Sequence, residues 1–306
     1  MIWPTLEYAA WKETGQSLHM WAQIVGKFRL AQTPWLNHSW HATLYPHVRG
    51  LTTGLIPGGW EVRFDLVDHR LIVSSASGES AGFDLAPMSV SAFNASFKDR
   101  LRAVGAPDVY HGSPNEVPDP VPFALQTDPG AYDRAAVRDW WHAIVAMTPI
   151  LQEFRTGFLG KSSPVHLFWG SFDMAVTRFS GRTAPLHPGG FPALPDAVTQ
   201  EAYSHEVSSA GFWAGGNGAD EAMFYSYAYP VPDGFADQPA GPDGAFFDTG
   251  LGEFLLPYRV VAKASDPRAV LLEFLSATYE AAAQTGQWDR NALDCALGRP
   301  GIPRVL

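Results

Sequence analysis

The chain has 306 residues, of which 46% are hydrophobic and 17% charged, and its formal net charge at pH 7 is −10. This composition predicts a folded globular protein with a substantial core and excludes a disordered chain. The negative charge and the lack of any run of Lys and Arg argue against nucleic acid as a partner, because binding to phosphates needs clustered positive charge.

The single cysteine, Cys295, excludes an intrachain disulfide and a cysteine-rich zinc site. The first residues lack the basic and then apolar pattern of a signal peptide. No window approaches the roughly 18 uncharged apolar residues of a membrane helix. We therefore expect a cytoplasmic protein with no membrane partner.

The first part of the chain predicts a helix, an antiparallel meander and a second helix. Apolar residues recur at helical spacing from residue 14 to residue 31, and Thr33-Pro34 ends that helix. Apolar and polar residues then alternate in about four strands joined by turns, at residues 38–53, 60–67, 70–75 and 81–85. The second predicted helix spans residues 90–104 and is closed by Gly105.

A proline-rich connection, residues 108–130, leads to a second series of elements. A helical pattern returns over residues 134–159, where Pro149 should kink the helix or split it in two. Strands are predicted at residues 165–180, 203–213, 222–229 and 253–261. A last helix begins at Asp266-Pro267 and ends at Gly286.

The fold class that this order predicts is α+β, with two successive halves that each contain helix, antiparallel strands and helix. The halves are residues 1–107 and 131–306, and together they should form one compact unit. An internal duplication is one explanation of the order, because His41 and His166 follow similar helix ends and Thr52 and Thr177 each lie 11 residues after their histidine. It would give two antiparallel sheets related by a pseudo-two-fold axis, with ligand sites where they meet.

Two segments, residues 162–182 and 203–213, combine strand-like apolar runs with ionisable groups and indoles. Buried charge is costly unless it is paired, so this mixture makes them the candidate site. A histidine and a carboxylate within hydrogen-bond reach would allow general acid–base chemistry. The candidate catalytic residues are His166, Asp173, His205 and Glu206. The candidate ligand-binding residues are Trp169, Arg178, Arg182, Trp213 and Tyr225.

Whether His166 faces a carboxylate depends on Gly170 in the predicted strand. Without a bulge at Gly170, Arg178 shares the face of His166; with one, Asp173 does. Because a glycine inside an apolar strand often marks a bulge, we favour the second arrangement. The alternative for each of these residues is a structural role, as a buried polar group satisfied by the backbone or by a partner.

The sequence names no cofactor. His166, Asp173, His205 and Glu206 have suitable donor atoms for a metal, but their spacing matches no known metal-binding pattern, so we predict no metal site. A G-x-S-x-G nucleophile elbow, a phosphate-binding loop and a dinucleotide fingerprint are all absent from the sequence. The identity of any cofactor stays open.

The segments HLFWGSFDMAVTRFSGR, EAYSHEVSSAGFW and FYSYAYP resemble a bacterial family catalogued as a domain of unknown function. The resemblance also covers WHATLYPHVRGLTTG near the start and LLEFLSATYEAAA near the end. It implies a compact unit over nearly the whole chain. It brings no activity, cofactor or catalytic residue with it.

The functional hypothesis is an enzyme that uses a histidine and a carboxylate on a small anionic or aromatic molecule. Eleven tryptophans favour an aromatic-lined pocket for that molecule. The alternative is a protein that binds a small molecule or another protein without catalysis. In either case we expect a monomer or a weak dimer.

Overall fold

A computed structural model describes residues 2–216 and 219–304. Its α-helices are α1 (Tyr8–Gln32), α2 (Val90–Ala103), α3 (Arg134–Thr156), α4 (Asp196–Ala202), α5 (Tyr258–Ala262), α6 (Pro267–Thr285) and α7 (Arg290–Leu293). Its strands are β1 (Thr43–His47), β2 (Gly50–Thr52), β3 (Trp60–Asp65), β4 (Arg70–Ser75), β5 (Ser80–Asp84), β6 (His166–Phe168), β7 (Asp173–Thr183), β8 (His205–Trp213), β9 (Met223–Tyr229), β10 (Phe246–Asp248) and β11 (Glu253–Pro257). Helices and strands are mixed along the chain, so the predicted α+β class is confirmed.

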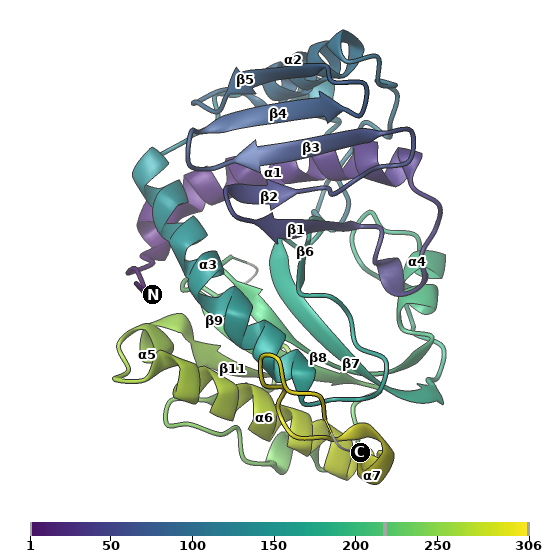
Figure 1. Cartoon of the computed structure of the whole chain (residues 1–306), viewed down its shortest axis with the longest axis vertical. Helices are drawn as coiled ribbons and strands as arrows, with labels where there is room; N and C mark the ends of the chain where they lie inside the picture. Colours follow the sequence, from purple (N-terminus) through teal and green to yellow (C-terminus); the bar gives the residue numbers. More distant parts are fainter. Residues whose placement is uncertain (1, 217–218, 305–306) are drawn as a thin grey trace.

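All the strands belong to one antiparallel sheet with the order β10-β11-β9-β8-β7-β6-β1-β2-β3-β4-β5. The two halves of the sheet meet where β1 pairs with β6, through Thr43 opposite Phe168 and Leu44 opposite Leu167 (Figure 1). The expectation of two separate sheets is therefore wrong. The two halves repeat the order of elements within a single sheet, and an internal duplication remains a prediction.

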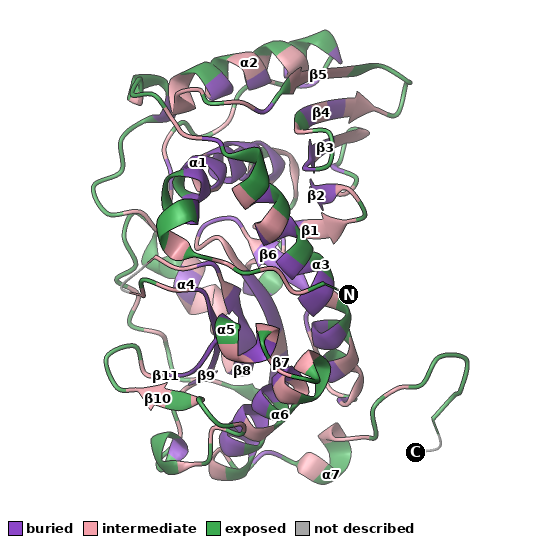
Figure 2. Cartoon of the chain, turned by 90° about the vertical axis from the view of Figure 1, so that its left-hand side faces the viewer, coloured by how far each residue is buried: buried purple, intermediate pink, exposed green. Residues whose placement is uncertain are grey.

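One face of the sheet is covered by long helices. In the first half, the ring of Trp21 on α1 stacks on Phe93 of α2 with centroids 4.9 Å apart, and Phe93 stacks in turn on Phe64 of β3. In the second half, α3 and α6 pack on β7 and β9. Buried residues are concentrated in α1 and in these strands (Figure 2), so the core follows the helix-covered face.

Helix α3 runs through Pro149 without ending there, so of the two predicted alternatives, a kink or a split, the split into two helices is wrong. Asp133 begins the helix as its N-cap, and its side chain accepts hydrogen bonds from the backbone N–H groups of Ala135 and Ala136. None of the described helices combines the length and the apolar character that crossing a membrane needs.

The predicted continuous strand over residues 165–180 is a β-hairpin. Strand β6 ends at Phe168, a turn contains Gly170, and β7 starts at Asp173, which pairs with Phe168. Gly170 thus lies in a turn and not in a β-bulge. The hairpin places His166 opposite Ala175 and so puts His166 and Asp173 on the same face of the sheet.

Candidate functional site

A cavity of about 540 Å³ lies on the second half of the sheet, on the face that the long helices leave free. Side chains alternate along each strand, so Arg178 of β7 points towards α3 and α6 while its neighbours Thr177 and Phe179 line the cavity. The floor consists of three rows of paired residues from β7, β8 and β9: Ala175, Gly211 and Tyr225; Thr177, Ser209 and Tyr227; Phe179, Val207 and Tyr229.

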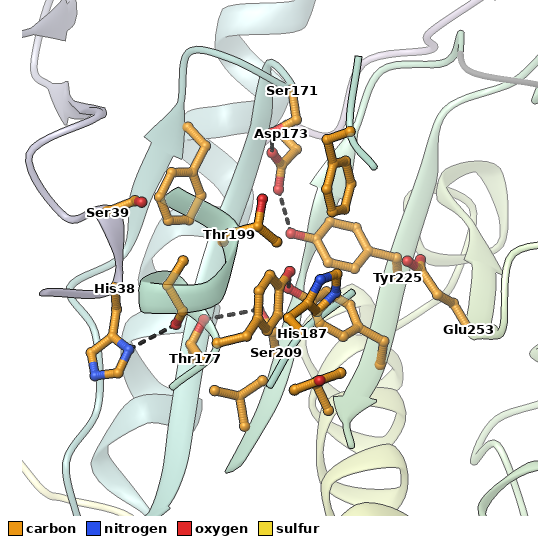
Figure 3. A pocket seen from close by; sticks show the side chains of 18 of the residues that line it. His38, Ser39, Ser171, Asp173, Thr177, His187, Thr199, Ser209, Tyr225 and Glu253 are labelled. Atoms are coloured by element: carbon orange, nitrogen blue, oxygen red, sulfur yellow. Dashed lines mark hydrogen bonds between the residues drawn. The ribbon is translucent and has the colours of Figure 1, made fainter. Parts of the chain in front are cut away.

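The walls come from segments that are distant in the sequence. The turn after α1 contributes His38, the proline-rich connection contributes Glu116, and the segment before α4 contributes His187. Strand β11 adds Glu253 at one side (Figure 3). The cavity is therefore assembled by both halves of the chain.

Asp173 is the centre of the polar end of the cavity. Its Oδ2 accepts a hydrogen bond from the Tyr225 hydroxyl, and its Oδ1 accepts one from the Ser171 hydroxyl (Figure 3). Burial raises the pKa of Asp173, and the two hydrogen bonds act against that rise because they stabilise the charged carboxylate. Asp173 is thus a half-buried carboxyl group whose two oxygens each accept a hydrogen bond.

Glu116 and Glu253 bring two further carboxyl groups to the described lining. Burial, together with the charge of Asp173, raises the pKa of each to about 7. Lys27 opposes the rise at Glu116, whereas Asp248 adds to the rise at Glu253. Both groups therefore exchange protons near neutral pH, which is the property that general acid–base catalysis and pH-dependent binding require.

Gly170 allows Glu116 to reach this position. A Cβ atom at residue 170 would overlap the Glu116 carboxylate, so a larger residue would force that carboxylate to move. The same turn is held to α1 by His19, whose Nε2 lies 2.7 Å from the Gly170 carbonyl oxygen. The glycine in the β6–β7 turn thus permits the close approach of Glu116 in the cavity wall.

A row of tyrosines crosses the cavity floor along β9. The rings of Tyr225 and Tyr227 stack with centroids 6.1 Å apart, and the hydroxyl of Tyr227 lies 2.8 Å from that of Tyr203. Burial raises the pKa of Tyr203 to about 12 and raises the pKa of Tyr227 well above its ordinary value. These phenols stay protonated at neutral pH and present O–H groups as well as ring faces.

Aromatic rings close the opposite end of the cavity. The His187 ring lies 4.8 Å from the ring of Tyr203 and 4.8 Å from that of Tyr229, centroid to centroid, and it also stacks with Phe191 at 5.9 Å. Burial lowers the pKa of His187, so the ring is neutral at pH 7. We call His187, Phe191, Tyr203 and Tyr229 the aromatic box.

Of the nine residues proposed from the sequence, the structure brings Asp173, Trp213 and Tyr225 together in the cavity lining. The Trp213 ring lies 5.4 Å from that of Tyr225, centroid to centroid. Trp169 lies outside the lining, packed under Gly26 of α1 and within 5.4 Å of the Lys27 ammonium.

His166 is fully buried next to the cavity without lining it. Its ring packs edge-on against Phe168 with centroids 4.6 Å apart, and neither ring nitrogen has a hydrogen-bond partner. Burial and the nearby Arg29 lower its pKa to about 3. The ring is therefore neutral at physiological pH and is held by packing.

His205 and Glu206 point in different directions from β8. The Nδ1 of His205 lies 3.1 Å from the Ser204 hydroxyl, and its ring meets that of His38 at 5.6 Å. Glu206 accepts hydrogen bonds from Arg182 at 2.6 Å and from the Ser180 hydroxyl at 2.8 Å. The structure thus pairs Glu206 with Arg182 outside the cavity lining.

Arg178 lies on the helix-covered face, away from the cavity. Its guanidinium is 3.6 Å from the ring centre of Phe154 and 4.2 Å from that of Tyr279, and it donates to the Phe154 carbonyl oxygen. Burial lowers its pKa to about 10. Its surroundings are those of a residue that joins α3 and α6 to the sheet through cation–π contacts.

Sequence reasoning did not identify Glu116, Glu253, Tyr203, Tyr227 or His187 as site residues. The alternation of Tyr225, Tyr227 and Tyr229 was a visible signal, because it places the three rings on one face. Nothing local marks Glu116 or Glu253. Among the described residues, no group of three or more His, Cys, Asp or Glu side chains is placed to hold a metal ion.

Comparison with known families gives one match, and it spans nearly the whole chain. No curated protein and no solved structure matches the chain. A family model described as a family of unknown function (DUF5996) matches residues 3–295. The resemblance inferred from the sequence segments is thereby confirmed, and the chain belongs to the DUF5996 family.

Proposed function

We propose that this protein binds a small organic molecule in the cavity over β7, β8 and β9. The observation that carries the proposal is the cavity itself, whose volume of about 540 Å³ falls within the usual range for ligand sites. Its lining combines aromatic rings with a few convergent polar groups, as small-molecule sites do. In this proposal Trp213 and Tyr225 keep the ligand-binding role that the sequence suggested, and Asp173, suggested as a catalytic residue, contacts the ligand beside them.

The lining favours a neutral or a cationic ligand over the anionic one first considered. The described lining residues include three carboxylic side chains and no Lys or Arg. The two arginines expected to hold an anion have other partners, since Arg178 contacts Phe154 and Arg182 contacts Glu206. An anion would meet like charge without compensation.

Acid–base catalysis is a second candidate function, favoured by the carboxyl groups of Glu116 and Glu253. A group whose pKa is about 7 is available as both acid and base at neutral pH. The hydrogen-bonded pair of Asp173 and Tyr225 would position a polar group of the ligand between Glu116 and Glu253. In this version of the hypothesis the carboxyl groups replace histidine as the proton carriers.

A cavity-filling variant tests the binding proposal. Thr177 lies in the middle row of the floor, so Thr177→Phe would occupy ligand space. Native mass spectrometry of the gently purified protein, and a thermal-shift screen of small molecules, should give ligands that the wild type binds and this variant does not. Thr127→Phe on the exposed connection is the matched control. Equal binding by Thr177→Phe and wild type would contradict the proposal.

A further inference from the structure

The cavity has two chemically different ends, and their separation defines a ligand class. The polar end holds the carboxyl groups of Asp173 and Glu253 (Figure 3). The carboxyl group of Glu116 lies at the same end, beside the turn at Gly170. The other end is the aromatic box. Tyr225 lies at the polar end and Tyr229 in the box, and the four residue steps from one to the other span about 13 Å of extended strand.

Resting on the proposed function, we propose that the ligand is a small organic ammonium compound, with its cationic nitrogen at the carboxyl end and a flat apolar group in the aromatic box. The charge of the nitrogen would compensate carboxylates that have little compensation in the protein. The flat group would lie among rings that bury apolar area and stack. The class is that of arylalkylamines.

The partners of each carboxyl group support this assignment. Asp173 receives its hydrogen bonds from the neutral hydroxyls of Ser171 and Tyr225. Glu116 faces Asp173 and Lys27, but the Lys27 ammonium donates to the Asn115 side chain and lies over the Trp169 ring. The carboxyl end thus has negative charge in excess.

Within the described part of the chain, the charged groups that face Glu253 include no cation. The titratable groups around it are the carboxyl groups of Asp173 and Asp248 and the phenols of Tyr203, Tyr225 and Tyr227. Its backbone places it next to the tyrosine row, since the following residue, Phe254, pairs with Ser226 of β9. A bound ammonium would supply the missing positive charge.

The pH dependence of binding follows from the same groups. In the empty cavity Glu116 and Glu253 have pKa values of about 7, so each gains negative charge as the pH rises from 6 to 8. An aliphatic amine stays protonated over this range. The affinity for the amine should therefore increase by about tenfold for each carboxyl group that must ionise.

Three probes with one ring and different charge test the inference: 2-phenylethylamine, 2-phenylethanol and 3-phenylpropionate. Binding is measured by calorimetry or by ligand-observed NMR at pH 8. We expect the amine to bind at least about tenfold more tightly than the alcohol, because a hydrogen bond to a charged group in a buried site is worth that factor. The carboxylate should bind most weakly.

Variants that remove one negative charge show which carboxyl group recognises the ammonium. Glu253→Gln should weaken amine binding by about tenfold and leave binding of the alcohol nearly unchanged. Glu273→Gln, an exposed position on α6, is the matched control and should change neither. If Glu253→Gln does not fold, Glu116→Gln and the wild-type series from pH 6 to pH 8 provide the same test.

Two results would overturn the inference. Binding of the alcohol or the carboxylate as tightly as the amine would show that charge is not recognised, and the cavity proposal would survive. Failure of all three probes to bind would also reject the arylalkylamine class. The cavity proposal is judged separately, by the response of co-purified or screened ligands to Thr177→Phe.

Discussion

The phenol of Tyr225 on β9 reaches across β8 to donate a hydrogen bond to Asp173 on β7. The strand between them carries Gly211 at this level, paired with Ala175 on one side and Tyr225 on the other. A side chain at residue 211 would begin 2.6 Å from the Tyr225 hydroxyl oxygen. Because Gly211 has no side chain, the Tyr225 hydroxyl can pass over β8 and reach Asp173 on β7.

Gly211→Ala should therefore destabilise the protein and separate Tyr225 from Asp173. The new methyl group would also overlap the backbone carbonyl of Met174, so the cost should be about 1–3 kcal/mol. Urea denaturation measures this change. Gly112→Ala, where a Cβ atom would meet open space, is the control and should be neutral. Equal stability of both variants would refute the crossing role of Gly211.

Tyr225→Phe should raise the pKa of Asp173. The hydroxyl of Tyr225 stabilises the charged form of this carboxyl group. Without that hydroxyl, less remains to oppose the rise in pKa that burial causes. Carbon-detected NMR titration of the Asp173 carboxyl group measures the shift. Tyr229→Phe, which loses only a hydrogen bond to the Pro185 carbonyl oxygen, should leave the titration unchanged. A lowered pKa in Tyr225→Phe would contradict the assignment.

The folding stability of the protein should respond to the raised pKa values of Glu116 and Glu253. Each pKa rises from 4.5 to about 7 on folding, so between these pH values the native state binds more protons than the unfolded state. Stability from these groups is therefore present below pH 4.5 and is lost as the pH rises to 7, with at most about 3 kcal/mol for each group. The double variant Glu116→Gln, Glu253→Gln should show a flatter decline over this window in urea titrations. An unchanged pH profile would show that the two carboxyl groups titrate normally.

His166→Leu should stabilise the protein most at acid pH. The native ring has a pKa of about 3 against 6.5 when unfolded, so the unfolded state alone takes up a proton as the pH falls below 6.5. The wild type loses that stability and the leucine variant does not. Denaturation at pH 5 and pH 8 measures the difference. An equal effect of the substitution at both pH values would argue against a neutral buried histidine.

Periodicity predicted the α+β class, because the order of helices and strands follows from local patterns of apolar residues. It failed at the β6–β7 hairpin, since Trp169 and Phe172 on either side of Gly170 continue the apolar character of the flanking strands and conceal the turn. Periodicity could not identify Glu116 for a different reason. That carboxyl group reaches the cavity from a proline-rich connection, and its contact with Gly170 joins positions far apart in the sequence.

The search for ionisable residues in apolar, strand-like segments identified both cavity residues and residues with a structural role. Asp173 belongs to the cavity, whereas Arg178 binds α3 and α6 to the other face of the same strand. The two differ by an odd number of positions, so alternation alone places them on opposite faces once the hairpin is known. The sequence could not decide which of the two faces a helix would cover.

A crystal structure of the protein grown with 2-phenylethylamine at pH 8 tests the central claim most directly. We predict density for the amine in the cavity, with its nitrogen within hydrogen-bond distance of a carboxylate oxygen of Glu116, Asp173 or Glu253 and its ring among Tyr203, Tyr229 and His187. An empty cavity at saturating amine, or an amine bound elsewhere on the protein, would contradict the account.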